Sequence, residues 1–149
     1  MVIMMTFCVP GEPVGKGRPR FCRVGKGVRT YTPPKTAEYE ARVREAFERA
    51  RGGFRMPPGK PLRLDVTAVF SVSKSTPKRR AQQMRDGLVP HLKKPDADNV
   101  LKAVADALNG VAFEDDAAVV SMHIDKRYGE EPCTAVALSV IEEDGHAKQ

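Results

Sequence analysis

Apolar and polar residues alternate with the period of two that is typical of a β-strand in three stretches of the chain. These stretches cover residues 62–72, 119–127 and 133–141. Because only five residues separate the last two, we expect them to pair as a closing hairpin. An apolar run over residues 2–9 stops at a Pro-Gly pair and predicts a further, buried strand.

Two other stretches repeat their apolar residues at spacings of three and four, so they predict amphipathic helices. The first covers residues 37–51, with Thr36 as a candidate N-cap and a Gly-Gly pair after its end. We expect this helix to be structural. The second follows Asp96 and Asp98, either of which can cap it, and ends near residue 108.

Length and composition favour a single domain with a polyanionic partner. A chain of 149 residues can bury its own core, and its 25 Lys and Arg against 19 Asp and Glu give a net charge of +6. Such a charge favours nucleic acid or an anionic membrane, although ordinary solubilising charge gives the same total. No stretch approaches the roughly 18 apolar residues of a membrane span, and the apolar start lacks the features of a signal peptide.

The three cysteines are scattered without metal-ligand spacing, which argues for reduced thiols in the cytoplasm. We therefore expect a cytoplasmic protein without a membrane partner. One domain is expected over residues 1–141, followed by a flexible tail over residues 142–149.

Positive charge gathers in two stretches that interrupt the regular pattern. Residues 11–32 alternate glycine and proline with basic residues and predict a short hairpin in which Phe21 and Tyr31 are interleaved. Residues 73–94 form a long polar connection with a short helix expected over residues 77–85, and such connections tend to be functional or mobile. Both stretches suit phosphate contacts, and the aromatic residues suit base stacking. The candidate DNA contacts are Lys16, Arg18, Arg20, Arg23, Lys26, Arg29, Lys74, Lys78, Arg79, Arg80, Lys93 and Lys94.

Negative charge is concentrated around the second helix. Asp96 and Asp98 stand two residues apart at its start, and Lys102 follows Asp98 by one helical turn. Asp115 and Asp116 come after a short loop beyond its end. An Asp-x-Asp pair ahead of a helix can direct both carboxylates at one locus, and Asp115 or Asp116 can supply a third.

Three carboxylates that leave positions open for water and phosphate oxygens describe a Mg²⁺ site with one or two ions, in which Mn²⁺ can substitute. In phosphodiester hydrolysis such a metal lowers the pKa of the attacking water and offsets charge on the phosphate. Lys102 would add a fixed positive charge for the transition state. This combination favours a metal-dependent nuclease.

Each of these features also has an ordinary structural interpretation. An Asp before a helix is usually an N-cap, and an Asp–Lys pair one turn apart is usually a surface pair that contributes roughly 0.2–0.5 kcal/mol. The spacing excludes an EF-hand and a P-loop, and the separated histidines do not support a zinc site. A non-catalytic DNA-binding protein therefore stays open beside the nuclease.

The acid-rich segment resembles the RusA family of crossover junction endodeoxyribonucleases, small Holliday junction resolvases. The residues that carry the resemblance are, in order, Pro95-Asp96-Ala97-Asp98-Asn99-Val100-Leu101-Lys102, Asp106-Ala107-Leu108-Asn109-Gly110 and Asp115-Asp116-Ala117-Ala118-Val119. Residues 13–20 and 31–33 are also similar to many members. Ala118 departs from the pattern, because members often have Gln there.

The resemblance implies that Asp96, Asp98 and Asp116 are catalytic metal-binding carboxylates and that Lys102 is the catalytic lysine. Asp115 becomes an accessory ligand. It also implies a single-domain α/β (α+β) fold, with a mixed sheet of four to five strands and two main helices. A nucleoid-associated homodimer is expected, because two-fold symmetry suits paired nicks in a four-way junction.

The resulting expectation is a Mg²⁺-dependent endodeoxyribonuclease that resolves Holliday junctions by paired symmetric nicks during DNA recombination and repair. Two alternatives remain at this point. One is the non-catalytic DNA-binding protein. The other is a metal-dependent nuclease for another branched DNA or for RNA.

Overall fold

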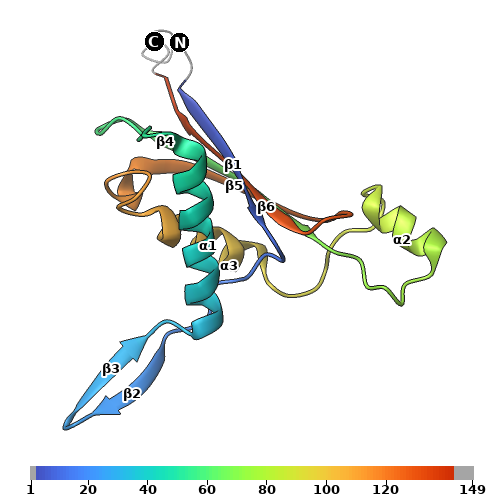
Figure 1. Cartoon of the computed structure of the whole chain (residues 1–149), viewed down its shortest axis with the longest axis horizontal. Helices are drawn as coiled ribbons and strands as arrows, with labels where there is room; N and C mark the ends of the chain where they lie inside the picture. Colours follow the sequence, from blue (N-terminus) through green and yellow to red (C-terminus); the bar gives the residue numbers. More distant parts are fainter. Residues whose placement is uncertain (1–2, 143–149) are drawn as a thin grey trace.

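A four-stranded mixed sheet forms the centre of the computed structural model, which describes residues 3–142 (Figure 1). Its strands are β1 (Met4–Pro10), β4 (Leu62–Phe70), β5 (Val119–Tyr128) and β6 (Cys133–Val140). The strand order is β1-β6-β4-β5, in which β6 runs antiparallel to both neighbours and β5 runs parallel to β4. The predicted mixed sheet and single-domain α+β fold are confirmed. Residue 2 of the predicted first strand and residues 143–149 of the predicted tail lie outside the described residues.

The predicted closing hairpin is wrong, because β4 lies between β5 and β6. The short connection passes over the end of β4, where the Gly129 amide donates to the Phe70 carbonyl at 3.0 Å. The approach is so close that a Cβ on Gly129 would lie 2.5 Å from a methyl group of Val69. A short connection therefore does not require its two strands to pair, since it can bridge across the end of a third.

The first strand is also less buried than its apolar sequence predicts. β1 is an edge strand that points Met5, Phe7 and Val9 into the core and exposes the alternate residues. One face of this part of the sheet therefore meets solvent, as is common where antiparallel strands meet.

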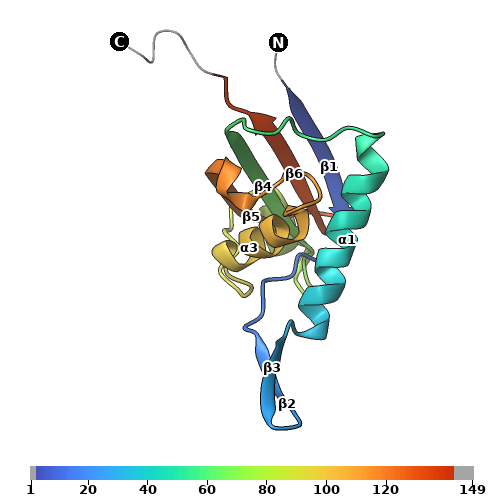
Figure 2. The same ribbon diagram turned by 90° about the vertical axis from the view of Figure 1, so that its left-hand side faces the viewer.

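Two helices cover the other face of the sheet, α1 (Pro34–Arg51) and α3 (Ala97–Leu108) (Figure 2). α1 buries Tyr39, Val43 and Phe47, and α3 buries Val100 and Val104, because these apolar residues recur along one side of each helix. A shorter helix, α2 (Lys78–Arg85), lies at the side of the domain, and a 3-10 turn, η1 (Asp116–Ala118), precedes β5. Within the described residues, no helix is long and apolar enough to span a membrane.

A two-stranded ribbon projects away from the domain (Figures 1 and 2). It consists of β2 (Arg20–Val24) and β3 (Gly27–Tyr31), which pair antiparallel across the turn that the sequence predicts. Every residue of both strands is exposed, including Phe21, whose exposed fraction is 71%. We call this ribbon the arm. It buries nothing in the core, so its residues are free to contact another molecule.

Candidate active site

One face of α3 carries the polar side chains that the sequence singled out. Asp98, Lys102 and Asp106 follow one another at one-turn intervals and therefore share a side of the helix. Asp116, the first residue of η1, comes to the same side through the loop that follows α3. A cavity of about 280 Å³, which we call the α3 cavity, is lined by Asp98, Leu101, Lys102, Ala105, Asp106, Asp116 and Met122. The structure thus brings three predicted site residues together.

Asp116 lies among other carboxylates. A hydrogen bond with Asp115, then partial desolvation, and then the negative charges of Asp115 and Asp106 raise the pKa of Asp116 above its usual range, while Lys102 acts in the opposite direction. Negative charge therefore exceeds the nearby positive charge at this end of the α3 cavity. A bound cation would be stabilised there.

Asp96 lies apart from this group. It is the residue at the N-cap position of α3, yet its side chain makes no cap bond and its Oδ1 accepts a hydrogen bond from Lys94 Nζ at 2.8 Å. That bond is the main reason why the pKa of Asp96 lies below its usual value. Because residues two apart on a helix do not face each other, Asp96 and Asp98 line different cavities. Its predicted role as a metal ligand stays a prediction.

The oxygen ligands around the α3 cavity fit a hard cation that keeps most of its water. Asp98 and Asp116 border the cavity, and Asp115 adjoins it. Within residues 3–142, however, no three His, Cys, Asp or Glu side chains converge closely enough to hold a metal ion by themselves. Mg²⁺ is often held by one or two carboxylates together with substrate phosphate, so a sparse set of ligands is compatible with it.

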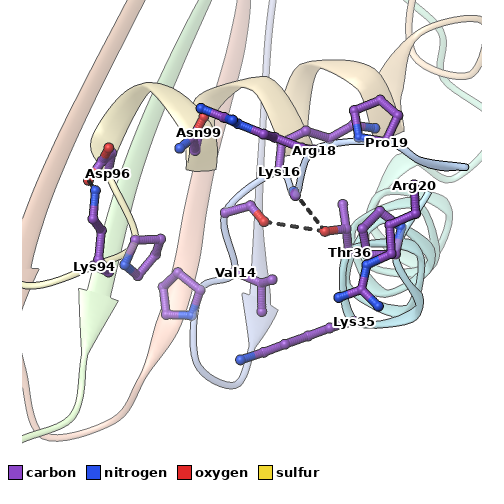
Figure 3. Close-up of a pocket in the computed structure, with 15 residues that line it drawn as sticks. Val14, Lys16, Arg18, Pro19, Arg20, Lys35, Thr36, Lys94, Asp96 and Asn99 are labelled. Carbon is purple, nitrogen blue, oxygen red and sulfur yellow. Dashed lines mark hydrogen bonds and ion pairs between the residues drawn. The ribbon is translucent and has the colours of Figure 1, made fainter.

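A larger cavity of about 640 Å³ lies beside the start of α3 (Figure 3). We call it the loop cavity, because residues 13–20 form one wall and the starts of α1 and α3 form the others. Its cationic side chains are Lys16, Arg18, Arg20, Lys35 and Lys94. A cavity with this lining suits a phosphate group, and Asp96 stands at its edge.

Comparison with known proteins decides the family. Residues 10–139 match the family model described as Endodeoxyribonuclease RusA, which covers most of the chain. The chain belongs to the RusA family. It is also 34% identical over 138 residues to the uncharacterized protein YqaN of Bacillus subtilis (strain 168), a match that covers 91% of this chain and 95% of the relative. The segments that carry the sequence resemblance all lie within the matched residues.

In this RusA-family endodeoxyribonuclease, the predicted DNA contacts differ in their freedom to bind DNA. The cations on the arm, on α2 and in the connection to α3 are exposed. Lys16 is the exception, because only 18% of its side chain is exposed and its Nζ lies 2.8 Å from Glu40 Oε2 and 3.2 Å from Asp106 Oδ2. Burial alone would lower the pKa of Lys16, but hydrogen bonds and charges from Glu40 and Asp106 outweigh it and raise that pKa. Lys16 is therefore already paired with two carboxylates, and its role as a DNA contact stays a prediction.

Sequence reasoning missed several residues around the two cavities of this RusA-family protein. Lys35 lines the loop cavity. Lys126 donates a hydrogen bond to the Lys93 carbonyl at 2.6 Å, and its positive charge helps to lower the pKa of Asp96. The period of two along β5 could have identified Lys126, since it shares a face with Met122, which lines the α3 cavity. Glu40 had a signal of its own, since it stands three residues before Val43 and seven before Phe47 and therefore falls on the buried side of α1.

Proposed function

We propose that this RusA-family chain is a Mg²⁺-dependent endodeoxyribonuclease that resolves four-way DNA junctions by paired symmetric nicks, in recombination and repair. The observation that carries the proposal is the meeting of Asp98, Lys102 and Asp116 at one cavity in a chain of an endodeoxyribonuclease family. Carboxylates and a lysine at one locus are the groups that phosphodiester hydrolysis requires.

The residues that would hold the metal are Asp98 and Asp116, with Asp115 beside them. Asp96 lines the loop cavity with its Oδ1 paired to Lys94, so it would join them only if its side chain moved. When bound, Mg²⁺ would offset negative charge on the scissile phosphate and lower the pKa of the attacking water. The carboxylates of the chain would fix where the phosphate sits.

Lys102 is the side chain best placed to act on the phosphate directly. Its side chain is 63% exposed, and its Nζ lies 3.4 Å from Asp106 Oδ2, a long contact that the ammonium can leave without burying an unpaired charge. Placed against the scissile phosphate, the ammonium would donate hydrogen bonds to the oxygens on which negative charge increases in the transition state.

The arm supplies a DNA-binding surface that is separate from the chemistry. Its register places Phe21, Arg23 and Val28 on one face, and it places Tyr31, Arg29 and Val24 on the other. Each face therefore combines exposed apolar side chains with arginine, which suits stacking on bases beside phosphate contacts. A branch point offers unpaired or unstacked bases more readily than a continuous duplex, so the arm favours branched DNA.

A homodimer completes the proposal. Two symmetric nicks in a four-way junction require two identical sites related by a two-fold axis, and a symmetric dimer provides them. The exposed cations of α2 and of the connection to α3 would follow the strands between these sites.

A substrate panel tests the choice of substrate and metal. Equimolar four-way junction, flap, duplex and RNA substrates are incubated with the unaltered chain in Mg²⁺, in Mn²⁺ and in EDTA, and initial rates are compared. We expect cutting of the junction in either metal, little cutting of the other substrates and none in EDTA. Equal rates on all substrates would contradict the junction proposal, and tight binding without cutting would favour the non-catalytic DNA-binding alternative.

A further inference from the structure

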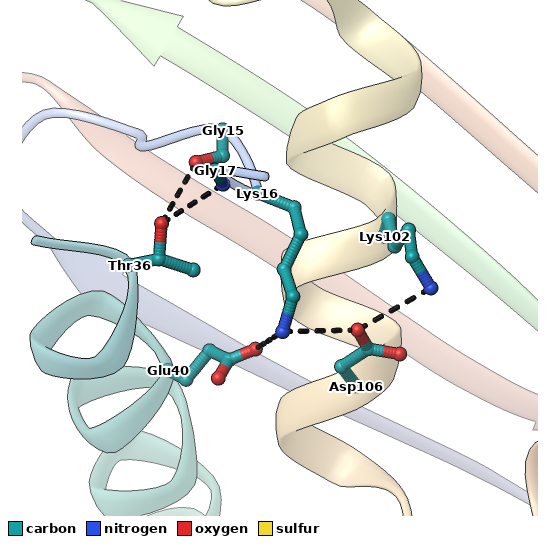
Figure 4. A network of polar contacts seen from close by, with 7 residues as sticks. All are labelled: Gly15, Lys16, Gly17, Thr36, Glu40, Lys102 and Asp106. Atoms are coloured by element: carbon teal, nitrogen blue, oxygen red, sulfur yellow. Dashed lines mark hydrogen bonds and ion pairs between the residues drawn. The ribbon is translucent and has the colours of Figure 1, made fainter. Parts of the chain in front are cut away.

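Lys16 is the centre of a charge network that joins three parts of the fold (Figure 4). Its Nζ contacts Glu40 Oε2 of α1 at 2.8 Å and Asp106 Oδ2 of α3 at 3.2 Å. The Glu40 side chain is only 11% exposed, so its carboxylate depends on Lys16 for compensation. The two residues therefore form a mostly buried pair beside the α3 cavity.

The backbone around Lys16 is held as firmly as its side chain. The Lys16 amide donates to the Asn99 carbonyl at 2.8 Å, and the Gly17 amide donates to Thr36 Oγ1 at 2.9 Å. A Cβ on Gly15 would come within 2.8 Å of Pro95, so the loop passes α3 at a distance that only glycine allows. Thr36, predicted as an N-cap, holds this loop instead, because α1 begins two residues earlier at Pro34.

Asp106 connects this network to Lys102. The same oxygen, Asp106 Oδ2, lies 3.2 Å from Lys16 Nζ and 3.4 Å from Lys102 Nζ. Two ammonium groups therefore share one carboxylate oxygen, and each weakens the other's hold on it. Lys16 is anchored by Glu40 and by the loop, whereas Lys102 is exposed and can move.

We propose that Lys16, held by Glu40, is a positioning residue that occupies Asp106 and so keeps Lys102 free for the scissile phosphate. Lys16 itself touches neither metal nor DNA. Without it, Asp106 would pair with Lys102 alone, and the ammonium would have to break a stronger ion pair before reaching the phosphate. This inference rests on the proposed function, because it assigns Lys102 to the substrate phosphate.

The test removes both members of the buried pair together, because Lys16→Met alone would leave the Glu40 carboxylate uncompensated and could unfold the chain. For Lys16→Met/Glu40→Gln we expect kcat on a four-way junction to fall about tenfold and Kd to change less than about twofold. Adding Asp106→Asn to this double variant releases Lys102. We therefore expect the kcat of the triple variant to lie several-fold above that of the double variant, and below that of the unaltered chain because the Asp106 charge is also lost from the cavity.

The control is Glu45→Gln/Arg49→Met, which removes an exposed ion pair from the same helix and should leave kcat unchanged. A double variant with unchanged kcat, or a triple variant as slow as the double, would overturn the inference. A Kd that rises as much as kcat falls would instead make Lys16 a DNA contact. Cutting by the unaltered chain in the same assay tests the proposed function separately, since the inference concerns only ratios to that rate.

Discussion

Lys102 and Asp106 make one weak contact at the α3 cavity, and the proposed function assigns Lys102 to the scissile phosphate. The lysine is largely exposed and its contact with Asp106 is long, so it contributes little to the stability of the fold. For Lys102→Met we therefore expect an unchanged Tm, a kcat lower by about a hundredfold and a Kd for junction DNA within about threefold of the unaltered value. Single-turnover cleavage measures the rate of cutting, and fluorescence anisotropy measures Kd.

Lys60→Met, which removes another exposed lysine, is the matched control. Equal effects of the two substitutions would contradict the assigned role.

Asp116, unlike Lys102, is expected to affect the stability of the fold as well as cleavage. Its pKa is raised in the folded protein, so the protonated form is favoured there, and this contribution to stability is lost as pH rises through the folded pKa. At neutral pH and without metal, the ionised carboxylate therefore destabilises the fold. We expect Asp116→Asn to raise Tm at pH 7 in EDTA while abolishing most cleavage, and to change Tm less at a pH below the ordinary carboxylate pKa. Glu114→Gln, an exposed neighbour, should change neither quantity. A lower Tm for Asp116→Asn in EDTA would contradict this account.

At the scale of single elements, the arm is the part of the fold whose role can be tested apart from folding. Phe21 is fully outside the core, so Phe21→Ala should leave Tm unchanged. If the ring stacks on a base, its loss should weaken junction binding by about 1–3 kcal/mol, which corresponds to a rise in Kd of roughly 5- to 150-fold. Anisotropy in the Asp98→Asn background, which we expect not to cut, measures this change in binding alone. Phe54→Ala, which removes a partly exposed ring from another loop, should have no effect. Equal binding by both variants would remove the arm from the DNA-binding surface.

The positive charges of the arm can be tested separately, through the salt dependence of DNA binding. Phosphate contacts release counterions, so the logarithm of the binding constant falls with the logarithm of salt concentration in proportion to their number. Replacing Arg23 and Lys26 by Met should reduce that slope by roughly two, whereas Phe21→Ala should leave it nearly unchanged. Binding isotherms between low and moderate salt measure the slope. An unchanged slope for the Arg23/Lys26 variant would mean that these cations do not meet phosphates.

Local patterns in the sequence predicted the elements that depend on neighbours along the chain. The arm followed from alternation around its glycine turn, and the polar face of α3 followed from the one-turn spacing of Asp98 and Lys102. The position of β4 between β5 and β6 could not be predicted in this way, because strand order depends on contacts between distant segments. The same limit explains Lys16, whose partners Glu40 and Asp106 lie far away in sequence.

At the scale of the whole molecule, the proposal requires two copies of the chain. Each chain has a mass of 16.4 kDa, so light scattering coupled to gel filtration should give twice that value at the concentrations used for cleavage. A single junction bound by one dimer should be nicked twice, and the two nicks should lie at symmetric positions. A mass of one chain under conditions of full activity would contradict the two-fold arrangement.

The most direct test of the central claim is cleavage of one labelled synthetic four-way junction by the unaltered chain and by Asp98→Asn, each in Mg²⁺ and in EDTA. The account predicts paired, symmetric nicks by the unaltered chain in Mg²⁺ only, and it predicts that Asp98→Asn binds the junction with similar affinity but does not cut it. Cleavage by Asp98→Asn at the rate of the unaltered chain would contradict the account, because the α3 cavity would then not be the active site.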